Sequence, residues 1–139
     1  EIKNAHGIPI EELKAAIPCG IGKINVDTDI RLAVTRNMWE LFHNRPELRT
    51  SKSIGAIYRL LEKKKDEFDP RIFLTPIMDT LMFGAVPDQD VAAIVGCMER
   101  GVKEVVGTLI VEFGSVGKAP LVERPSLEEM ADRYRKGRC

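Results

Sequence analysis

The chain has 139 residues, of which 44% are hydrophobic and 30% are charged, and its 21 basic residues balance its 21 acidic ones. This composition is that of an ordinary globular domain with a core, and it excludes the disordered and collagen-like classes. A net charge of zero gives no reason to expect nucleic acid or an anionic membrane surface as a partner. No apolar run approaches the roughly 20 residues that span a bilayer, and the amino end has no leader pattern, so a soluble, cytoplasmic protein is expected.

The first predicted elements are a short helix and a strand. Pro9 stands at a first-turn position ahead of apolar residues at helical spacing, and the helix is expected to end near Pro18. Gly20 and Gly22 interrupt it, and residues 23–28 (KINVDT) then have the β-branched pattern of a buried strand. A lone strand cannot satisfy its own backbone donors and acceptors, so it needs neighbouring strands.

The rest of the chain is predicted to be mainly helical. Asp69 followed by Pro70, and Ser126 followed three residues later by Glu129, are helix-start signals. Pro76 should kink or delay the helix that opens at Asp69. Helices are expected over about 30–44, 53–67, 69–81, 88–113 and 126–136, with an extended loop at 114–125. Within 88–113, the stretch GTLIVEFG taken alone has the β-branched density of a short strand.

Polar side chains follow the predicted strand. Alternation places Asn25, Asp27 and Asp29 on one face, with Thr28 opposite. The order helix, strand, helix is typical of a βα unit in a parallel sheet or barrel, where ligands bind at the carboxyl ends of strands. The backbone amides of this turn, the Thr28 hydroxyl and the Arg31 guanidinium suit a phosphate. Alternatively, Asp27 and Asp29 only cap the following helix, and Arg31 is a surface charge.

Four stretches, GIGKINVDTDIRLA, FDPRIFLTP, FGSVGKA and SLEEMADRYRKG, stand in an order that resembles the carboxyl-terminal part of class II, metal-dependent fructose-bisphosphate aldolases. The resemblance implies an α/β fold, namely the carboxyl-terminal segment of a TIM (β/α)8 barrel with extra helices and only the last barrel strand present. It also favours helix for GTLIVEFG. Residues 1–139 would belong to one barrel domain, with the last βα unit at 20–44, helical additions at 51–113, and a tail with a final helix at 114–139.

The resemblance also implies an activity and roles for particular residues. It implies reversible aldol cleavage of fructose 1,6-bisphosphate to dihydroxyacetone phosphate and glyceraldehyde 3-phosphate, in which zinc polarises the carbonyl. Asn25 corresponds to a catalytic asparagine beside the reacting carbons, and Asp27 and Thr28 to residues that hold hydroxyl and phosphate oxygens. Arg31 corresponds to an arginine that reaches the second phosphate of a neighbouring active site, which implies a homo-oligomer.

The other chemistry-bearing residues match no site. His6 and His43 are the only histidines, and neither corresponds to a metal ligand of the family. The zinc ligands and the catalytic acid and base are therefore expected on the rest of the barrel, outside this chain, and the chain alone should not catalyse. Cys19, Cys97 and Cys139 are odd in number and far apart, which fits reduced structural thiols better than a disulfide framework.

Two other functions remain open. A tagatose-bisphosphate aldolase would share the fold, the metal and the motif, and it differs in stereochemistry at the fourth carbon of the substrate. A non-catalytic helical interaction module that reuses an aldolase tail would instead fold alone as a compact helical protein.

Overall fold

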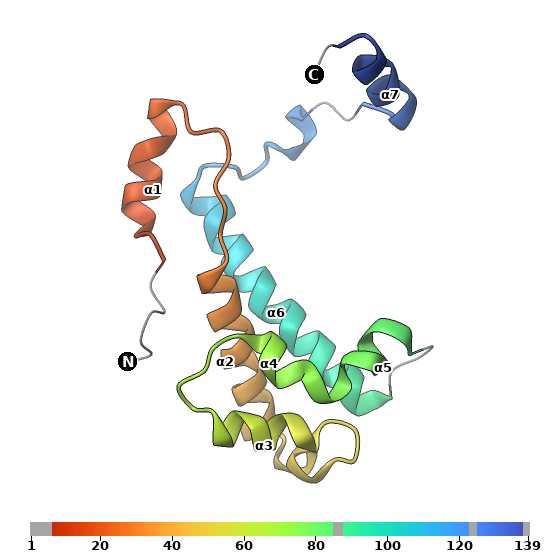
Figure 1. The fold of residues 1–139 in the computed structure, drawn as a ribbon. Helices are drawn as coiled ribbons and strands as arrows, with labels where there is room; N and C mark the ends of the chain where they lie inside the picture. The colour runs from red at the N-terminus through yellow and green to blue at the C-terminus, as the bar shows by residue number, and fades with distance from the viewer. Residues whose placement is uncertain (1–6, 85–87, 123–124, 138–139) are drawn as a thin grey trace.

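The structure is a computed structural model that describes residues 7–84, 88–122 and 125–137. Every regular element in this part of the chain is helical (Figure 1). None of these helices is long and apolar enough to cross a membrane. The α-helices are α1 (Ile10–Ala16), α2 (Thr28–Asn44), α3 (Gly55–Lys63), α4 (Pro70–Leu74), α5 (Met78–Phe83), α6 (Gln89–Glu112) and α7 (Leu127–Arg135). Single 3-10 turns lie at Ile17–Cys19, Pro46–Thr50, Thr75–Ile77 and Ala119–Leu121.

The two long helices α2 and α6 lie side by side and form the centre of the molecule (Figure 1). Gly101 of α6 makes this close approach possible. A Cβ atom at this glycine would lie 2.8 Å from the backbone nitrogen of Val34 and 2.9 Å from the carbonyl oxygen of Ala33. Those atoms belong to backbone and cannot move aside like a side chain, so the helix pair depends on a residue without a Cβ.

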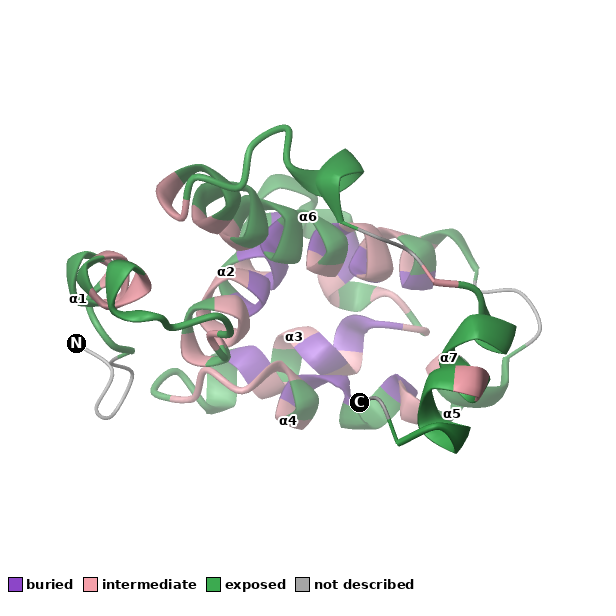
Figure 2. Cartoon of the chain, turned by 90° about the horizontal axis from the view of Figure 1, so that it is seen from above, coloured by how far each residue is buried: buried purple, intermediate pink, exposed green. Residues whose placement is uncertain are grey.

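The hydrophobic core lies where α3, α4 and the turn around Pro76 pack against the α2–α6 pair. Figure 2 shows the buried residues on the sides of these helices that face one another. The core residues are Val34, Met38, Leu41, Phe42, Leu48, Ile54, Ile57, Leu61, Phe73, Leu74, Ile77, Val91, Ile94 and Cys97. Because α2, α3, α4 and α6 all contribute to one cluster, these helices form a single packed body.

Local signals predicted most helix starts. The side chain of Asp69 accepts a hydrogen bond from the backbone of Arg71 and caps α4. Ser126 and Glu129 form the predicted capping box at α7. Pro76 interrupts the third predicted helix, which is divided into α4, a 3-10 turn and α5. The stretch GTLIVEFG is helical and completes α6, as the resemblance favoured.

The strand predicted over 23–28 is not confirmed. Residues 21–27 run from α1 to α2 without belonging to any helix or strand, and Thr28, expected in the strand, is the first residue of α2. A lone strand cannot satisfy its own backbone donors and acceptors. No other segment of the described chain forms a strand that could pair with residues 23–28, so the strand does not form. The β part of the predicted α/β fold is thus missing from the described residues.

The carboxyl-terminal tail departs from the body. Figure 1 shows α7 standing apart from the other helices, at the end of the segment that follows α6. Its apolar side chains stay exposed, including Leu127 at 85% and Tyr134 at 68%.

Candidate functional site

Three of the four predicted site residues meet in one small hollow. Asn25, Asp27 and Thr28 line it together, and its volume is about 250 Å³. The hollow lies between α1, the segment 21–27 and the start of α2. Its other lining residues are Gly7, Ile8, Leu13, Val26 and Asp29.

Burial alternates along residues 24–27 even though no strand forms. Ile24 and Val26 are half-buried, whereas Asn25, Asp27 and Asp29 are exposed. An extended chain turns successive side chains to opposite sides whether or not it is paired with a neighbour. Asn25, Asp27 and Asp29 line the small hollow together, but Thr28, predicted to lie on the opposite face, lines it too, because it already belongs to α2.

Arg31 is bound by two carboxylates. Its Nε lies 2.8 Å from Oδ1 of Asp27, and its Nη2 lies 2.5 Å from Oδ2 of the same residue. Its Nη1 donates to Oδ2 of Asp69 over 3.1 Å. The planar fork of the guanidinium is thus engaged by protein oxygens and lines neither the small hollow nor the neighbouring cleft.

The side chain of Asp27 does not cap α2. It occupies the N-cap position but makes no cap hydrogen bond, because both of its oxygens face Arg31. The alternative interpretation, in which this carboxylate serves only as a helix cap, is therefore not supported at Asp27. Without a side-chain cap, the first-turn backbone N–H groups of this 17-residue helix are available to an anion.

Asp69 is a neighbour of the site that the sequence identified only as a helix cap. Its carboxylate binds Arg71 as well as Arg31, with Nε of Arg71 at 2.9 Å from Oδ1. The side-chain hydrogen bond from Arg71 lowers the pKa of Asp69 below its usual value. The FDPR stretch predicts the cap, but no local pattern indicates the contact with Arg31, because 38 residues separate the two.

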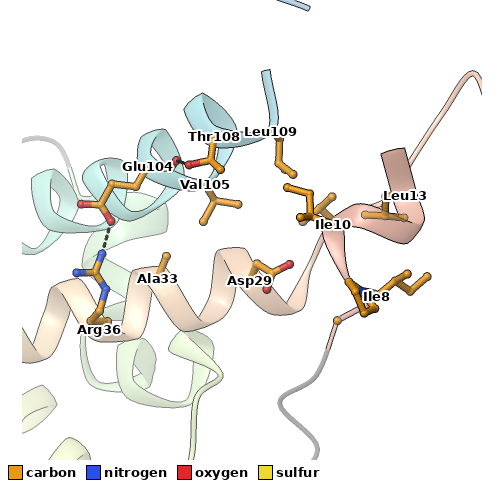
Figure 3. Close-up of a pocket in the computed structure, with 13 residues that line it drawn as sticks. Ile8, Ile10, Leu13, Asp29, Ala33, Arg36, Glu104, Val105, Thr108 and Leu109 are labelled. Carbon is orange, nitrogen blue, oxygen red and sulfur yellow. Dashed lines mark hydrogen bonds and ion pairs between the residues drawn. The ribbon is translucent and has the colours of Figure 1, made fainter. Parts of the chain in front are cut away.

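A larger cleft of about 450 Å³ adjoins the small hollow, between α1, α2 and α6 (Figure 3). Ile10 and Leu13 of α1 and Leu109 of α6 give it apolar walls, and the Arg36–Glu104 ion pair lies at one end. Sequence reasoning did not identify this cleft, because its walls come from segments that are distant along the chain.

The described residues offer no metal centre. No three His, Cys, Asp or Glu side chains converge there on a point that could hold an ion. His43 is exposed in the last turn of α2, and His6 lies outside the described residues. Cys19 is exposed and Cys97 is buried, both as free thiols, and Cys139 lies outside the described residues. No step through a metal is therefore assigned to these residues.

Comparison with known proteins connects this arrangement to a family. The family model described as class-II fructose-bisphosphate aldolase matches residues 3–118, which include α1, the small hollow, Arg31 and Asp69. The chain belongs to the class-II fructose-bisphosphate aldolase family. Members of this family share a TIM barrel, so the chain corresponds to part of such a barrel.

Individual aldolases are similar along almost the whole chain. The fructose-bisphosphate aldolase of Xanthobacter flavus is 33% identical over 137 residues, and that of Pseudomonas aeruginosa is 31% identical. Each alignment covers 99% of this chain but only 27% of the relative's length. Fructose-bisphosphate aldolase 2 of Rhodobacter capsulatus is 28% identical over 134 residues, which cover 82% of that protein. The comparison with solved structures gave no match.

Proposed function

We propose that this chain is the substrate-binding, carboxyl-terminal part of a class II fructose-bisphosphate aldolase. The proposed reaction is the reversible aldol cleavage of fructose 1,6-bisphosphate to dihydroxyacetone phosphate and glyceraldehyde 3-phosphate. The observation that carries the proposal is the meeting of Asn25, Asp27 and Thr28 in one hollow, within the stretch that the family model matches. A carboxamide, a carboxylate and a hydroxyl on one wall suit a ligand with several hydroxyl groups.

The proposed roles follow from the chemistry of each side chain. The Asn25 amide would orient the oxygens next to the scissile bond, and Asp27 would accept a hydrogen bond from a sugar hydroxyl. The Thr28 hydroxyl and the uncapped first turn of α2 would donate to phosphate oxygens. Arg31 is already bound by Asp27 and Asp69. Its guanidinium would therefore bind a substrate phosphate either alongside these two carboxylates or after exchanging one of them for a phosphate oxygen.

The remaining machinery is proposed to lie on the rest of the barrel. A divalent metal, with zinc as the expected ion, would polarise the substrate carbonyl when bound. Its ligands and the catalytic acid and base would come from residues outside this chain, consistent with the 27% share of the relatives' length that the chain spans. A soluble cytoplasmic enzyme that works as a homo-oligomer remains the expectation from the sequence.

The proposal is tested by Asn25→Ala in the complete enzyme. Turnover of fructose 1,6-bisphosphate should fall at least about tenfold, because orientation beside the reacting carbons is lost. Zinc content, measured by elemental analysis, should not change. The matched control is Asn44→Ala, which removes an exposed carboxamide at the far end of α2 and should leave turnover intact. Equal turnover in the Asn25 variant and the parent would remove the basis of the assignment.

The two alternatives need separate measurements. Steady-state cleavage of tagatose 1,6-bisphosphate and fructose 1,6-bisphosphate by the complete enzyme distinguishes the two aldolases. The specific feature that favours an aldolase over a non-catalytic module is that polar residues line the small hollow beside an uncapped helix start. A complete protein that binds no sugar bisphosphate would favour the interaction module.

A further inference from the structure

Lys23 holds the side chain of Asn25 from outside the small hollow. Its ammonium group donates a hydrogen bond to Oδ1 of Asn25, two residues further along the segment 21–27. Asn25 lines the small hollow, whereas Lys23 does not. Lys23 lines a neighbouring hollow of about 260 Å³, together with residues that include Ile17 and Phe113. The lysine therefore acts on the small hollow only through the asparagine.

The extended backbone of segment 21–27 brings these two side chains together. Residues two apart in an extended chain point to the same side, and they are separated by about 7 Å along it. Lys23 and Asn25 are accordingly both exposed, and Ile24 between them is half-buried. The four-carbon stem of the lysine is long enough to cross this distance. The contact thus needs only an extended backbone and no neighbouring strand.

The two ends of a carboxamide have opposite chemistry. The oxygen accepts hydrogen bonds and the nitrogen donates two, whereas a lysine ammonium only donates, so it can bind only the oxygen end. The oxygen and the nitrogen leave the same carbon in different directions. We propose that Lys23 is a positioning residue, which holds the oxygen of Asn25 so that the amide N–H groups face the ligand in the small hollow. The atom bound there is then a ligand oxygen that accepts hydrogen bonds.

The next polar side chain on this face is also bound by a cation. Both carboxylate oxygens of Asp27 face Arg31. Two acceptor groups on one face are thus each engaged by a positive side chain, which leaves the N–H groups of Asn25 and the hydroxyl of Thr28 as donors toward a ligand. Asp29 is the other carboxylate of the hollow, and it lines the larger cleft as well. Around Asn25 the arrangement therefore favours an acceptor oxygen.

An oriented amide has a specific use in the aldol cleavage proposed above, on which this inference rests. When the bond between the third and fourth carbons breaks, the hydroxyl proton of the fourth carbon goes to the catalytic base, and the bonding electrons pass to the ketone half of the substrate. Negative charge therefore grows on oxygen atoms of that half. Amide N–H groups that already point at such an oxygen bind it more strongly in the transition state than in the ground state. Loss of the orientation should lower kcat more than it raises KM.

Lys23→Met in the complete enzyme removes the ammonium group and keeps a long side chain. We expect kcat for fructose 1,6-bisphosphate to fall about tenfold while KM stays within about threefold of the parent, because the lysine does not touch the substrate. Lys23→Arg keeps a cationic donor and should hold kcat within about threefold of the parent. The matched control is Lys64→Met, at the exposed end of α3, which should leave kcat unchanged. A parental kcat in Lys23→Met, with a reduced one in Asn25→Ala, would overturn this inference alone, whereas a parental kcat in Asn25→Ala would overturn the proposed function.

Two further variants test the orientation itself. Lys23→Met combined with Asn25→Ala should lower kcat no further than Asn25→Ala alone, because the lysine acts through the asparagine. Asn25→Asp keeps an oxygen for Lys23 but has no N–H group, so its kcat should fall as far as that of Asn25→Ala. If the losses in the double variant multiplied, Lys23 would act by another route and the inference would be wrong. A parental kcat in Asn25→Asp would mean that the oxygen end faces the substrate, which would overturn it as well.

Discussion

Arg31 near the start of α2 donates from Nη1 to Oδ2 of Asp69 at the start of α4 over 3.1 Å, although 38 residues separate them. Arg31 also binds Asp27 through two of its nitrogens, and Asp69 also binds Arg71. Negative and positive side chains thus alternate through this group. Through its contact with Arg31, Asp69 connects the beginning of α4 to the beginning of α2.

Asp69→Ala should destabilise the fold. It removes the N-cap of α4 together with a carboxylate that is only 15% exposed and holds Arg31. Loss of the cap costs about 1 kcal/mol, and loss of a charge-assisted hydrogen bond costs about 1 to 3 kcal/mol. Urea unfolding followed by circular dichroism measures the change. Asp69→Asn keeps a cap acceptor and should lose less, so an equal loss in both variants would show that the cap contributes nothing.

The same carboxylate predicts part of the acid sensitivity of the fold. The hydrogen bond from Arg71 lowers the pKa of Asp69 in the folded state below its usual value of 3.8. A lowered pKa stabilises the folded chain above pH 3.8, and this contribution is lost as the pH falls below 3.8 through the lowered pKa. Free energies of unfolding measured from about pH 6 to about pH 2 should therefore fall less steeply in Asp69→Asn than in the parent. Parallel curves would contradict this assignment.

Local chemistry in the sequence predicted most of the helices, although for GTLIVEFG at the end of α6 the resemblance to the aldolases favoured helix against local propensity. The Asp69 and Ser126 caps and the Pro76 interruption each depend on a few neighbouring residues, and they appear where expected. Alternation in 23–28 was confirmed only in part. Ile24 and Val26 are more buried than Asn25 and Asp27, but Thr28, predicted on the opposite face, lines the same hollow as Asn25 and Asp27. Helix ends were less accurate, since α3 stops at Lys63 before the predicted 67.

The features that the sequence did not reveal join distant segments. A strand is stabilised by its neighbours, so the pattern at 23–28 could not by itself determine whether a strand forms. The larger cleft and the Arg31–Asp69 pair bring together segments that are far apart in the chain. The roles of Asn25, Asp27, Thr28 and Arg31 toward a substrate stay predictions.

The two described thiols should react very differently. Burial raises the pKa of Cys97 to about 11, so that this thiol stays protonated and enclosed in the folded chain. Cys19 is exposed next to a left-handed glycine. At about pH 8, iodoacetamide should label Cys19 within minutes and leave Cys97 unlabelled until urea unfolds the chain, because only an accessible thiolate reacts. Peptide mass spectrometry locates the label, and equal labelling of both residues would contradict the packing of α6.

Gly101→Ala tests the closeness of the central helix pair. The added Cβ would lie within 2.9 Å of backbone atoms of Ala33 and Val34, so α2 and α6 must separate. Overpacking of this kind destabilises by about 1 to 3 kcal/mol, which more than offsets the gain of about 1 kcal/mol from replacing a helical glycine. Thermal and urea unfolding should both show the loss.

Gly96→Ala is the matched control on the same helix. No atom lies within 4 Å of a Cβ at this position, so the substitution only improves helix propensity and should stabilise the fold by up to about 1 kcal/mol. The two substitutions are chemically identical, and the opposite signs expected of them can arise only from the distance between α6 and the backbone of α2. If Gly101→Ala stabilised the fold, α6 would have to lie farther from the backbone of Val34 in solution than it does in the structure.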